Sequence, residues 1–187
     1  MYEGITNPEE LLEWMKYINY GYQGKSKLHY TDDLDFDEVW YDEYILQEPQ
    51  KLIETKLGNC WDQTELERDW FRKHNYEVKT FYEMINLEYE NNYPTHSFLV
   101  YKDNDNNWCW FENSDFENRG IHKFSDLKSL MDYQISKYKE LLTTKNIKED
   151  ELNKLTIKEF DKPYYNITAE EYINHVLSGQ DFNIKNI

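Results

Sequence analysis

Two β-prone runs separated by a short polar loop constrain the fold of this chain more than any other feature. The runs Thr95–Tyr101 and Trp108–Glu112 are rich in aromatic and β-branched residues, and the loop 102–107 between them consists almost entirely of Asp and Asn. Two runs of this kind, so close in sequence, predict a β-hairpin. We therefore expect a sheet that contains at least one antiparallel pair of strands.

The register of this hairpin decides which side chains meet across it. If the loop is centred near Asn104, residues whose numbers sum to about 208 lie opposite each other. This register sets His96 across from Glu112, with both side chains on one face of the sheet. Cys109 should then point to the other face and belong to the core. A register changed by one residue brings Asn113 opposite His96 instead.

A second feature is a helix start at Cys60. Asn59 is a favourable N-cap residue, and residues 61–71 lack Gly and Pro and carry apolar residues at helical spacing. Cys60 then occupies the first helical position and Asp62 the third, from which its carboxylate can reach back to the Asn59 amide in a capping box. The unpaired N–H groups and the helix dipole favour a thiolate at Cys60. On this evidence alone, an inert buried cysteine is the commoner role.

The composition indicates one ordered domain over residues 1–187. Aromatic residues make up 17% of the chain, which has only 6 Gly and 4 Pro. Its 37 acidic and 21 basic residues give a net charge of -16, so a nucleic acid or an anionic membrane would be repelled. The two cysteines form no disulfide framework, and no signal peptide or long apolar run is present. We therefore expect a cytoplasmic protein with reduced cysteines.

The rest of the chain is expected to surround the sheet with helices, which makes the fold class α+β. The acidic run 31–38 lacks the glycine and the regular oxygen spacing of a calcium loop. His74 and His122 stand beside lysines and look exposed, and His175 has no Cys or acid at zinc-ligand spacing, so we expect no metal site. Hydrophobic spacing and capping residues predict a strand over 76–82 and helices over 8–20, 50–57, 125–142, 148–160 and from Thr168.

Three motifs, taken in order, resemble the transglutaminase-like superfamily of papain-fold cysteine enzymes. They are the G-x-C-x-D helix start at Gly58–Asp62, the histidine that opens the strand at Thr95–Phe98, and the aromatic strand Trp108–Glu112. The resemblance covers about residues 49–123. It implies a papain-like core, in which a catalytic helix packs on an antiparallel sheet, with additional N- and C-terminal helices.

The resemblance also implies roles for individual residues. Cys60 is the nucleophile, His96 the general base and acid, and Glu112 stands where the family usually has Asp. Because Glu is longer by one methylene, Asn113 is an alternative orienting residue. The cysteine position and the hairpin agree with this set, because an activated thiolate needs an imidazole and a third group that orients the imidazole.

The implied reaction is attack of the Cys60 thiolate on a carboxamide or peptide carbonyl of a protein or peptide substrate. Ammonia or an amine leaves, and water or an amine then accepts the acyl group from the thioester. The second oxyanion donor would be Trp40 or, less well placed, Gln63, with Asp62 in a supporting position. No cofactor is implied. The alternative function is a catalytically inactive acidic protein of the same fold that binds a basic partner.

Overall fold

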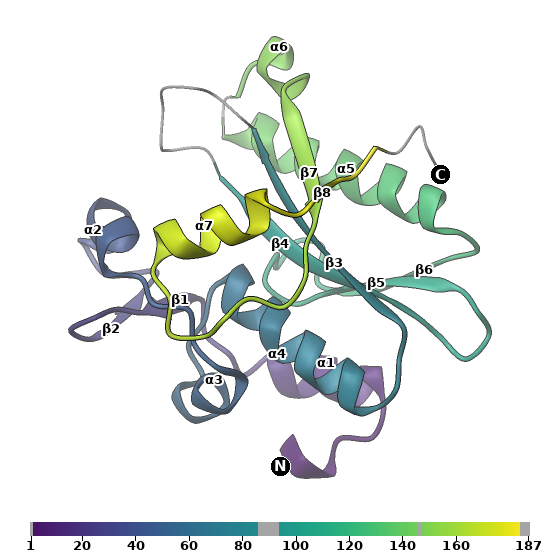
Figure 1. Ribbon diagram of the computed structural model, residues 1–187, viewed down its shortest axis with the longest axis horizontal. Coiled ribbons are helices and arrows are strands. Elements are labelled where there is room, and N and C mark those ends of the chain that lie inside the picture. Colours follow the sequence, from purple (N-terminus) through teal and green to yellow (C-terminus); the bar gives the residue numbers. More distant parts are fainter. Residues whose placement is uncertain (1, 86–93, 146, 184–187) are drawn as a thin grey trace.

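The computed structural model describes residues 2–85, 94–145 and 147–183, which form an α+β fold around a six-stranded antiparallel sheet (Figure 1). The strand order in this sheet is β6-β5-β4-β3-β7-β8, and β1 and β2 form a separate hairpin. In chain order the elements are a 3₁₀ turn Tyr2–Gly4, α1 Pro8–Met15, β1 Gly21–Gln23, β2 Leu28–Tyr30, α2 Phe36–Glu43, α3 Pro49–Thr55, α4 Cys60–Lys73, β3 Val78–Ile85, β4 His96–Lys102, β5 Trp108–Glu112, β6 Gly120–Phe124, α5 Leu127–Thr144, α6 Glu149–Leu152, β7 Leu155–Glu159, α7 Ala169–Leu177 and β8 Gln180–Asp181.

Helices cover both faces of the sheet (Figure 1). Side chains alternate between the faces along each strand. On one face Leu99 and Phe111 pack with apolar residues of α1 and α4, and on the other Phe98 and Trp110 pack against α5. Because both faces are covered, β4 and β5 are buried along nearly their whole length.

Helix α4 is the central helix of the fold. Eleven of its 14 residues are buried, among them the large apolar side chains of Trp61, Leu66 and Trp70. Trp61 also stacks on Tyr172 of α7, with ring centroids 4.3 Å apart. Burial on several sides fixes the position of α4, and therefore of the cysteine at its first residue.

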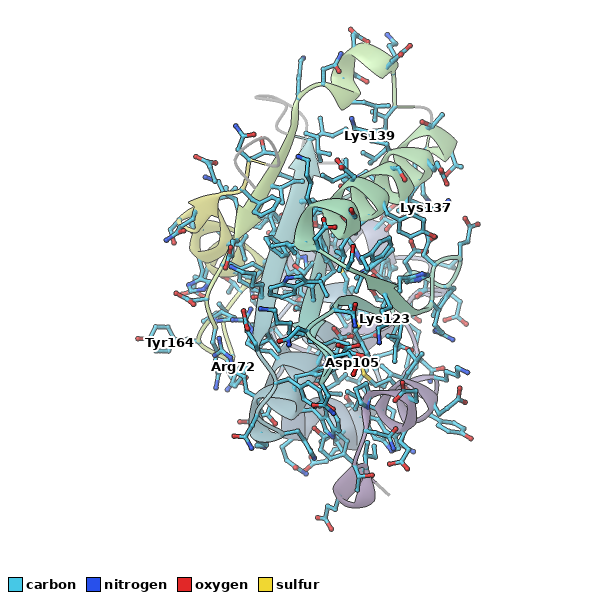
Figure 2. The ribbon with its side chains drawn as sticks, turned by 90° about the vertical axis from the view of Figure 1, so that its right-hand side faces the viewer. Arg72, Asp105, Lys123, Lys137, Lys139 and Tyr164 are labelled. Atoms are coloured by element: carbon cyan, nitrogen blue, oxygen red, sulfur yellow. The ribbon has the colours of Figure 1, made fainter. Side chains whose placement is uncertain are left out.

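The predicted hairpin is present, but its centre is residue 105 rather than Asn104. Leu99 pairs with Phe111, so the pairing differs from the expected one by two residues. The loop holds Asn106 in the left-handed conformation, and Lys123 on the neighbouring strand reaches Asp105 at 3.4 Å (Figure 2). Since a shift of two residues preserves the alternation of side chains, the face predicted for each residue remains correct.

Two of the expected helices differ from the observed elements. The helix predicted over 148–160 is wrong: α6 is one short turn, and 155–159 forms β7, which pairs with β3. Strand β3 would otherwise leave its backbone groups unpaired on the side away from β4, and β7 satisfies them while burying Ile157. Helix α1 ends at Met15, five residues earlier than expected, because the chain then turns into the β1–β2 hairpin.

No helix within residues 2–85, 94–145 and 147–183 is both long and apolar enough to cross a membrane.

Candidate active site

The start of α4 is built by short-range interactions. The Asn59 side chain accepts hydrogen bonds from the Trp61 and Asp62 amides, at 2.9 and 3.3 Å. Asp62 in turn accepts from the Asn59 amide at 3.1 Å, so the predicted capping box is present. A side chain at Gly58 would approach Asp62 Cβ to 2.9 Å and Leu52 to 2.6 Å. The glycine therefore allows the close turn that brings Cys60 to the first helical position.

Asp62 also fixes the helix start to the preceding chain. Its Oδ1 accepts hydrogen bonds from the Gln47 amide at 2.9 Å and from the Tyr44 hydroxyl at 3.2 Å. Burial raises the pKa of Asp62 to about 7, although the hydrogen bonds from Gln47, Asn59 and Tyr44 lower it. Asp62 thus supports the position of Cys60 without approaching the place of a reacting group.

His96 and Glu112 meet on one face of the sheet. His96 Nε2 lies 2.8 Å from Glu112 Oε2, across β4 and β5. In the observed register the two residues are diagonal rather than directly opposite, and the longer glutamate side chain spans the diagonal. The other oxygen, Oε1, accepts from the Ser114 amide, the Ser114 hydroxyl and the Asp115 amide, at 2.7, 2.9 and 2.8 Å. Four donors therefore hold this carboxylate in place.

His96 and Glu112 each favour the charged form of the other. Burial raises the pKa of Glu112, but the charge of His96 and the hydrogen bonds from His96, Asp115 and Ser114 outweigh burial, so the pKa is lowered. Burial lowers the pKa of His96, but the charge of Glu112 and the hydrogen bonds with Cys60 and Glu112 raise it well above its ordinary value. The pair thus favours an imidazolium beside Cys60.

Two further buried acids act on His96, and both differ from Glu112. Glu83 lies opposite His96 on β3, and its Oε1 accepts from Gln134 at 2.7 Å. Burial raises the pKa of Glu83 to about 8, and burial together with the charge of Glu112 raises that of Glu67 well above its ordinary value. Of the three acids, Glu112 alone has a lowered pKa, so it is the anion that faces His96.

Tyr20 is a site residue that the sequence did not indicate. Asn19 pairs with Leu57 in a parallel bridge, and the Gly58 amide donates to the Asn19 carbonyl at 3.1 Å, which brings the next residue, Tyr20, beside Cys60. Burial, followed by the charge and the hydrogen-bonding groups of Cys60, raises the pKa of Tyr20 well above its ordinary value. Local sequence contains no signal for this long-range pairing.

Asn113 and Gln63, which the sequence also indicates as site residues, hold neighbouring backbone in place. Asn113 points to the opposite face from Glu112, and its amide donates to Gln63 Oε1 at 2.7 Å and to the Met15 carbonyl at 3.1 Å. Gln63 in turn donates to the Gly58 carbonyl at 2.9 Å. Asn113 is therefore not in contact with His96, and Gln63 holds the chain before Cys60.

Trp40 packs against another tryptophan. Its ring lies edge-on to Trp61, with centroids 5.6 Å apart. Both cysteines are free and buried, and the Cys60 thiol is directed at the Thr95 carbonyl at 4.0 Å. Cys109 lies in the core on the face opposite to His96, as expected.

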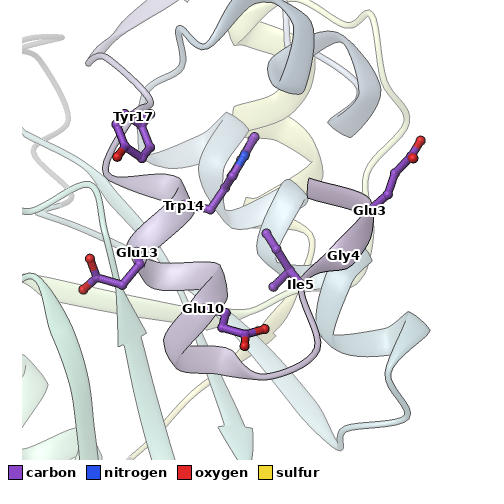
Figure 3. A pocket seen from close by; sticks show the side chains of 7 residues that line it. All are labelled: Glu3, Gly4, Ile5, Glu10, Glu13, Trp14 and Tyr17. Carbon is purple, nitrogen blue, oxygen red and sulfur yellow. The ribbon is translucent and has the colours of Figure 1, made fainter. Parts of the chain in front are cut away.

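The candidate site is nearly enclosed by protein. Cys60, His96 and Glu112 are 4%, 8% and 2% exposed. A hollow of about 640 Å³ on the surface lies beside α1 and is not lined by any of these three residues (Figure 3). It is lined by Glu3, Gly4, Ile5, Glu10, Glu13, Trp14 and Tyr17.

No known protein family and no curated protein matches this sequence. The geometry of Cys60, His96 and Glu112 is therefore the feature that indicates a function.

Proposed function

We propose that the chain is a cysteine-dependent amide hydrolase or acyltransferase with a transglutaminase-like, papain-like fold. Cys60 is the nucleophile, His96 the general base and acid, and Glu112 the residue that orients His96. The observation that carries this proposal is the 2.8 Å contact between Glu112 and His96 Nε2, which leaves Nδ1 for the thiol at the start of α4. The order of the three residues along the chain is the order in the superfamily that the sequence resembles.

In the proposed reaction the Cys60 thiolate attacks the carbonyl carbon of a protein or peptide amide. The C–N bond breaks, and the His96 imidazolium gives its proton to the departing ammonia or amine, which leaves a thioester on Cys60. Water, or an amine, then gives a proton to His96 and attacks the thioester, and the thiolate is released. Glu112 stabilises the imidazolium in both steps and fixes its tautomer.

We propose Tyr20, rather than Trp40 or Gln63, as the second oxyanion donor. The first donor is the backbone N–H of Cys60, and the pKa of Tyr20 depends on both the side chain and the backbone of Cys60, so the phenol is close to this N–H. A substrate oxygen would replace the phenol oxygen at this N–H and accept a hydrogen bond from the displaced hydroxyl. Gln63 already donates a hydrogen bond to the Gly58 carbonyl, and Trp40 packs on Trp61, so we prefer Tyr20 to both.

The test of the proposal is alkylation of the two cysteines by iodoacetamide over a range of pH, read by mass spectrometry. We expect Cys60 to react faster than Cys109, because burial raises the pKa of the Cys109 thiol. His96→Ala should slow the alkylation of Cys60 by at least about tenfold, the factor that corresponds to about 1.4 kcal/mol of thiolate stabilisation.

The matched control is His122→Ala. His122 lies in β6 of the same sheet and bonds to the Asn118 carbonyl at 2.7 Å, away from Cys60. His122→Ala should leave the alkylation rate of Cys60 unchanged. Ordinary thiol behaviour of Cys60, with the same rate in His96→Ala as in the wild type, would contradict the proposal.

A second candidate function is a catalytically inactive binding protein of the same fold. The near-complete burial of Cys60 and the net charge of -16 favour it. In that case Cys60→Ser should capture a basic partner as strongly as the wild type, with a salt-dependent affinity, and no acyl-enzyme should form.

A further inference from the structure

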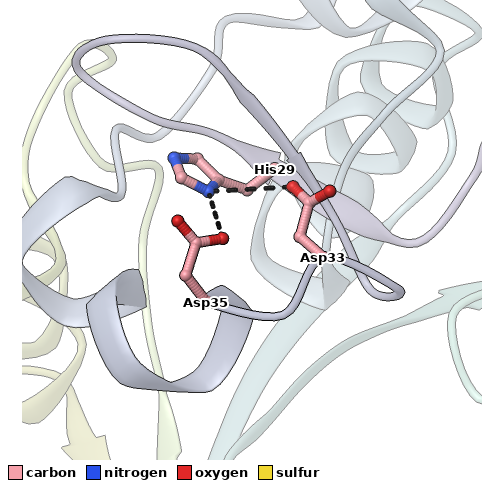
Figure 4. A group of neighbouring side chains, drawn as sticks. All are labelled: His29, Asp33 and Asp35. Atoms are coloured by element: carbon pink, nitrogen blue, oxygen red, sulfur yellow. Dashed lines mark ion pairs between the residues drawn. The ribbon is translucent and has the colours of Figure 1, made fainter.

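A histidine and two aspartates converge at the end of the β1–β2 hairpin, apart from the Cys60 site. His29 Nδ1 lies 3.9 Å from Asp33 Oδ2 and 3.7 Å from Asp35 Oδ1 (Figure 4). One ligand atom from each residue can be chosen so that all three lie within 4.8 Å of one another. The distances are too long for hydrogen bonds, so a space separates the three groups.

His29 is the observation that points to a ligand in this space. Its side chain is 2% exposed, and within the described part of the chain neither ring nitrogen has a hydrogen-bond partner. A buried polar group without a partner costs about 1–3 kcal/mol, and such groups are rare in folded proteins. An ion that accepts the lone pair of Nδ1 would remove this cost.

The surrounding residues fix the orientation of the His29 ring. His29 pairs with Tyr22 across the hairpin, and the two rings stack with centroids 4.7 Å apart. At Gly24 a side chain would approach His29 Nε2 to 2.8 Å, so glycine leaves room for the ring. On the other side of the ring, Glu43 Oε2 lies 3.9 Å from Nε2, and Ser26 holds this carboxylate. This distance is too long for a hydrogen bond, and Nε2 has no hydrogen-bond partner in the described part of the chain.

We propose that His29, Asp33 and Asp35 form a site for a divalent cation of the zinc type. Zinc lies about 2.0–2.2 Å from imidazole and carboxylate ligands, so tetrahedral ligand atoms are about 3.4 Å apart. The two carboxylates must therefore approach His29 Nδ1 by about 0.3–0.5 Å and each other by up to about 1.4 Å. One nitrogen and two oxygen donors suit zinc or manganese, whereas calcium prefers six to eight oxygens. Two carboxylates balance the charge of the ion.

Two contacts must adjust when the ion binds. Asp33 Oδ2 accepts from the Tyr30 amide at 2.9 Å, and the second lone pair of this oxygen can serve the ion. Lys27 lies 3.7 Å from Asp35 Oδ2 and is exposed, so it can move away from the cation. The sequence predicts no metal here, because the acidic run lacks the pattern of a calcium loop and the nitrogen ligand, His29, lies outside that run.

The proposed ion would join the β1–β2 hairpin to the start of α2. Asp35 is the residue before α2, and α2 carries Trp40, which packs on Trp61 beside Cys60. The ion would therefore stabilise an element next to the candidate active site. The proposal does not depend on the catalytic function, because its ligands take no part in the proposed reaction.

The experiment is calorimetric titration of the chelator-treated full-length chain with Zn²⁺, together with thermal unfolding. We expect one ion per chain and a higher Tm with Zn²⁺. Asp35→Asn should weaken binding by at least about tenfold, and so should His29→Gln. The Asp35 side chain is 43% exposed, against 2% for His29, so its variant should still fold if the histidine variant does not.

Two control variants distinguish this site from other acidic or thiol sites. Asp32→Asn changes an exposed acid of the same run and should leave the affinity unchanged. Cys60→Ser should also bind Zn²⁺ as the wild type does. No binding by the wild type, equal affinity in Asp35→Asn, or loss of binding in Cys60→Ser would overturn the proposal.

Discussion

Replacing Glu112 by glutamine tests the charge on which the candidate site depends. The amide keeps the shape of the carboxylate, and its oxygen can still accept the three hydrogen bonds from Ser114 and Asp115. The amide nitrogen then faces His96 Nε2, where the wild type has an anion at 2.8 Å. Two donors would meet if the ring were protonated, so Glu112→Gln disfavours the imidazolium.

The size of the effect follows from the loss of one buried, charge-assisted hydrogen bond, about 1.5–3 kcal/mol of unfolding free energy. The raised pKa of His96 contributes stability that is fully present below the unfolded value of about 6.5 and lost as the pH rises through the folded value. The lowered pKa of Glu112 contributes stability that is present above about 4.3 and lost as the pH falls. The difference between wild type and variant should therefore be largest between about pH 4.3 and 6.5.

Urea unfolding across this range and above it measures the difference, and NMR titration of the His96 ring gives its pKa directly. We expect the pKa of His96 to fall toward its ordinary value in Glu112→Gln. Glu117→Gln, which changes an exposed acid in the following loop, should have neither effect. A stability difference that does not depend on pH, or an unchanged His96 titration, would refute the role given to Glu112.

Three other variants separate the roles of neighbouring residues. Asn113→Ala should lower the unfolding free energy by about 1–3 kcal/mol, because two buried hydrogen bonds are lost, yet leave the His96 titration unchanged by NMR. Burial raises the pKa of Asp62 to about 7, so the contribution of Asp62 to the free energy of unfolding falls as the pH rises from about 4 to 7. In Asp62→Asn, urea unfolding should show a smaller fall in the free energy of unfolding over this pH range. Tyr20→Phe should slow acylation of Cys60 by about a hundredfold in stopped-flow assays, if its hydroxyl donates to the oxyanion.

The parts of the site that were predictable from sequence are those that local chemistry determines. The Asn59–Asp62 capping box depends on residues three apart, and the hairpin depends on a short loop between two β-prone runs. The centre of the loop was misplaced by one residue, because the sequence does not show that Asn106 adopts the left-handed conformation. The error moved the pairing by two residues and so preserved the face shared by His96 and Glu112.

The parts that were not predictable depend on contacts between distant segments. Tyr20 reaches Cys60 because Asn19 pairs with Leu57, and no periodicity records this pairing. The polar residues 148–154 favour a helix, and the run Leu155–Glu159 that follows them is too short to set itself apart from that helix until it pairs with β3. The sequence does not bring His29 together with Asp33 and Asp35, because their proximity arises from the shape of the turn between β2 and α2.

The most direct test of the central claim is formation of an acyl-enzyme on Cys60 by p-nitrophenyl acetate. The thiolate attacks the ester carbonyl and p-nitrophenolate leaves, so a burst of yellow product should equal the amount of protein, with one acetyl group on Cys60 by mass spectrometry. The burst should be absent in Cys60→Ser and strongly slowed in His96→Ala. No burst in the wild type, or acetylation of Cys60 at the same rate in His96→Ala, would contradict the assignment of Cys60, His96 and Glu112 as a catalytic set.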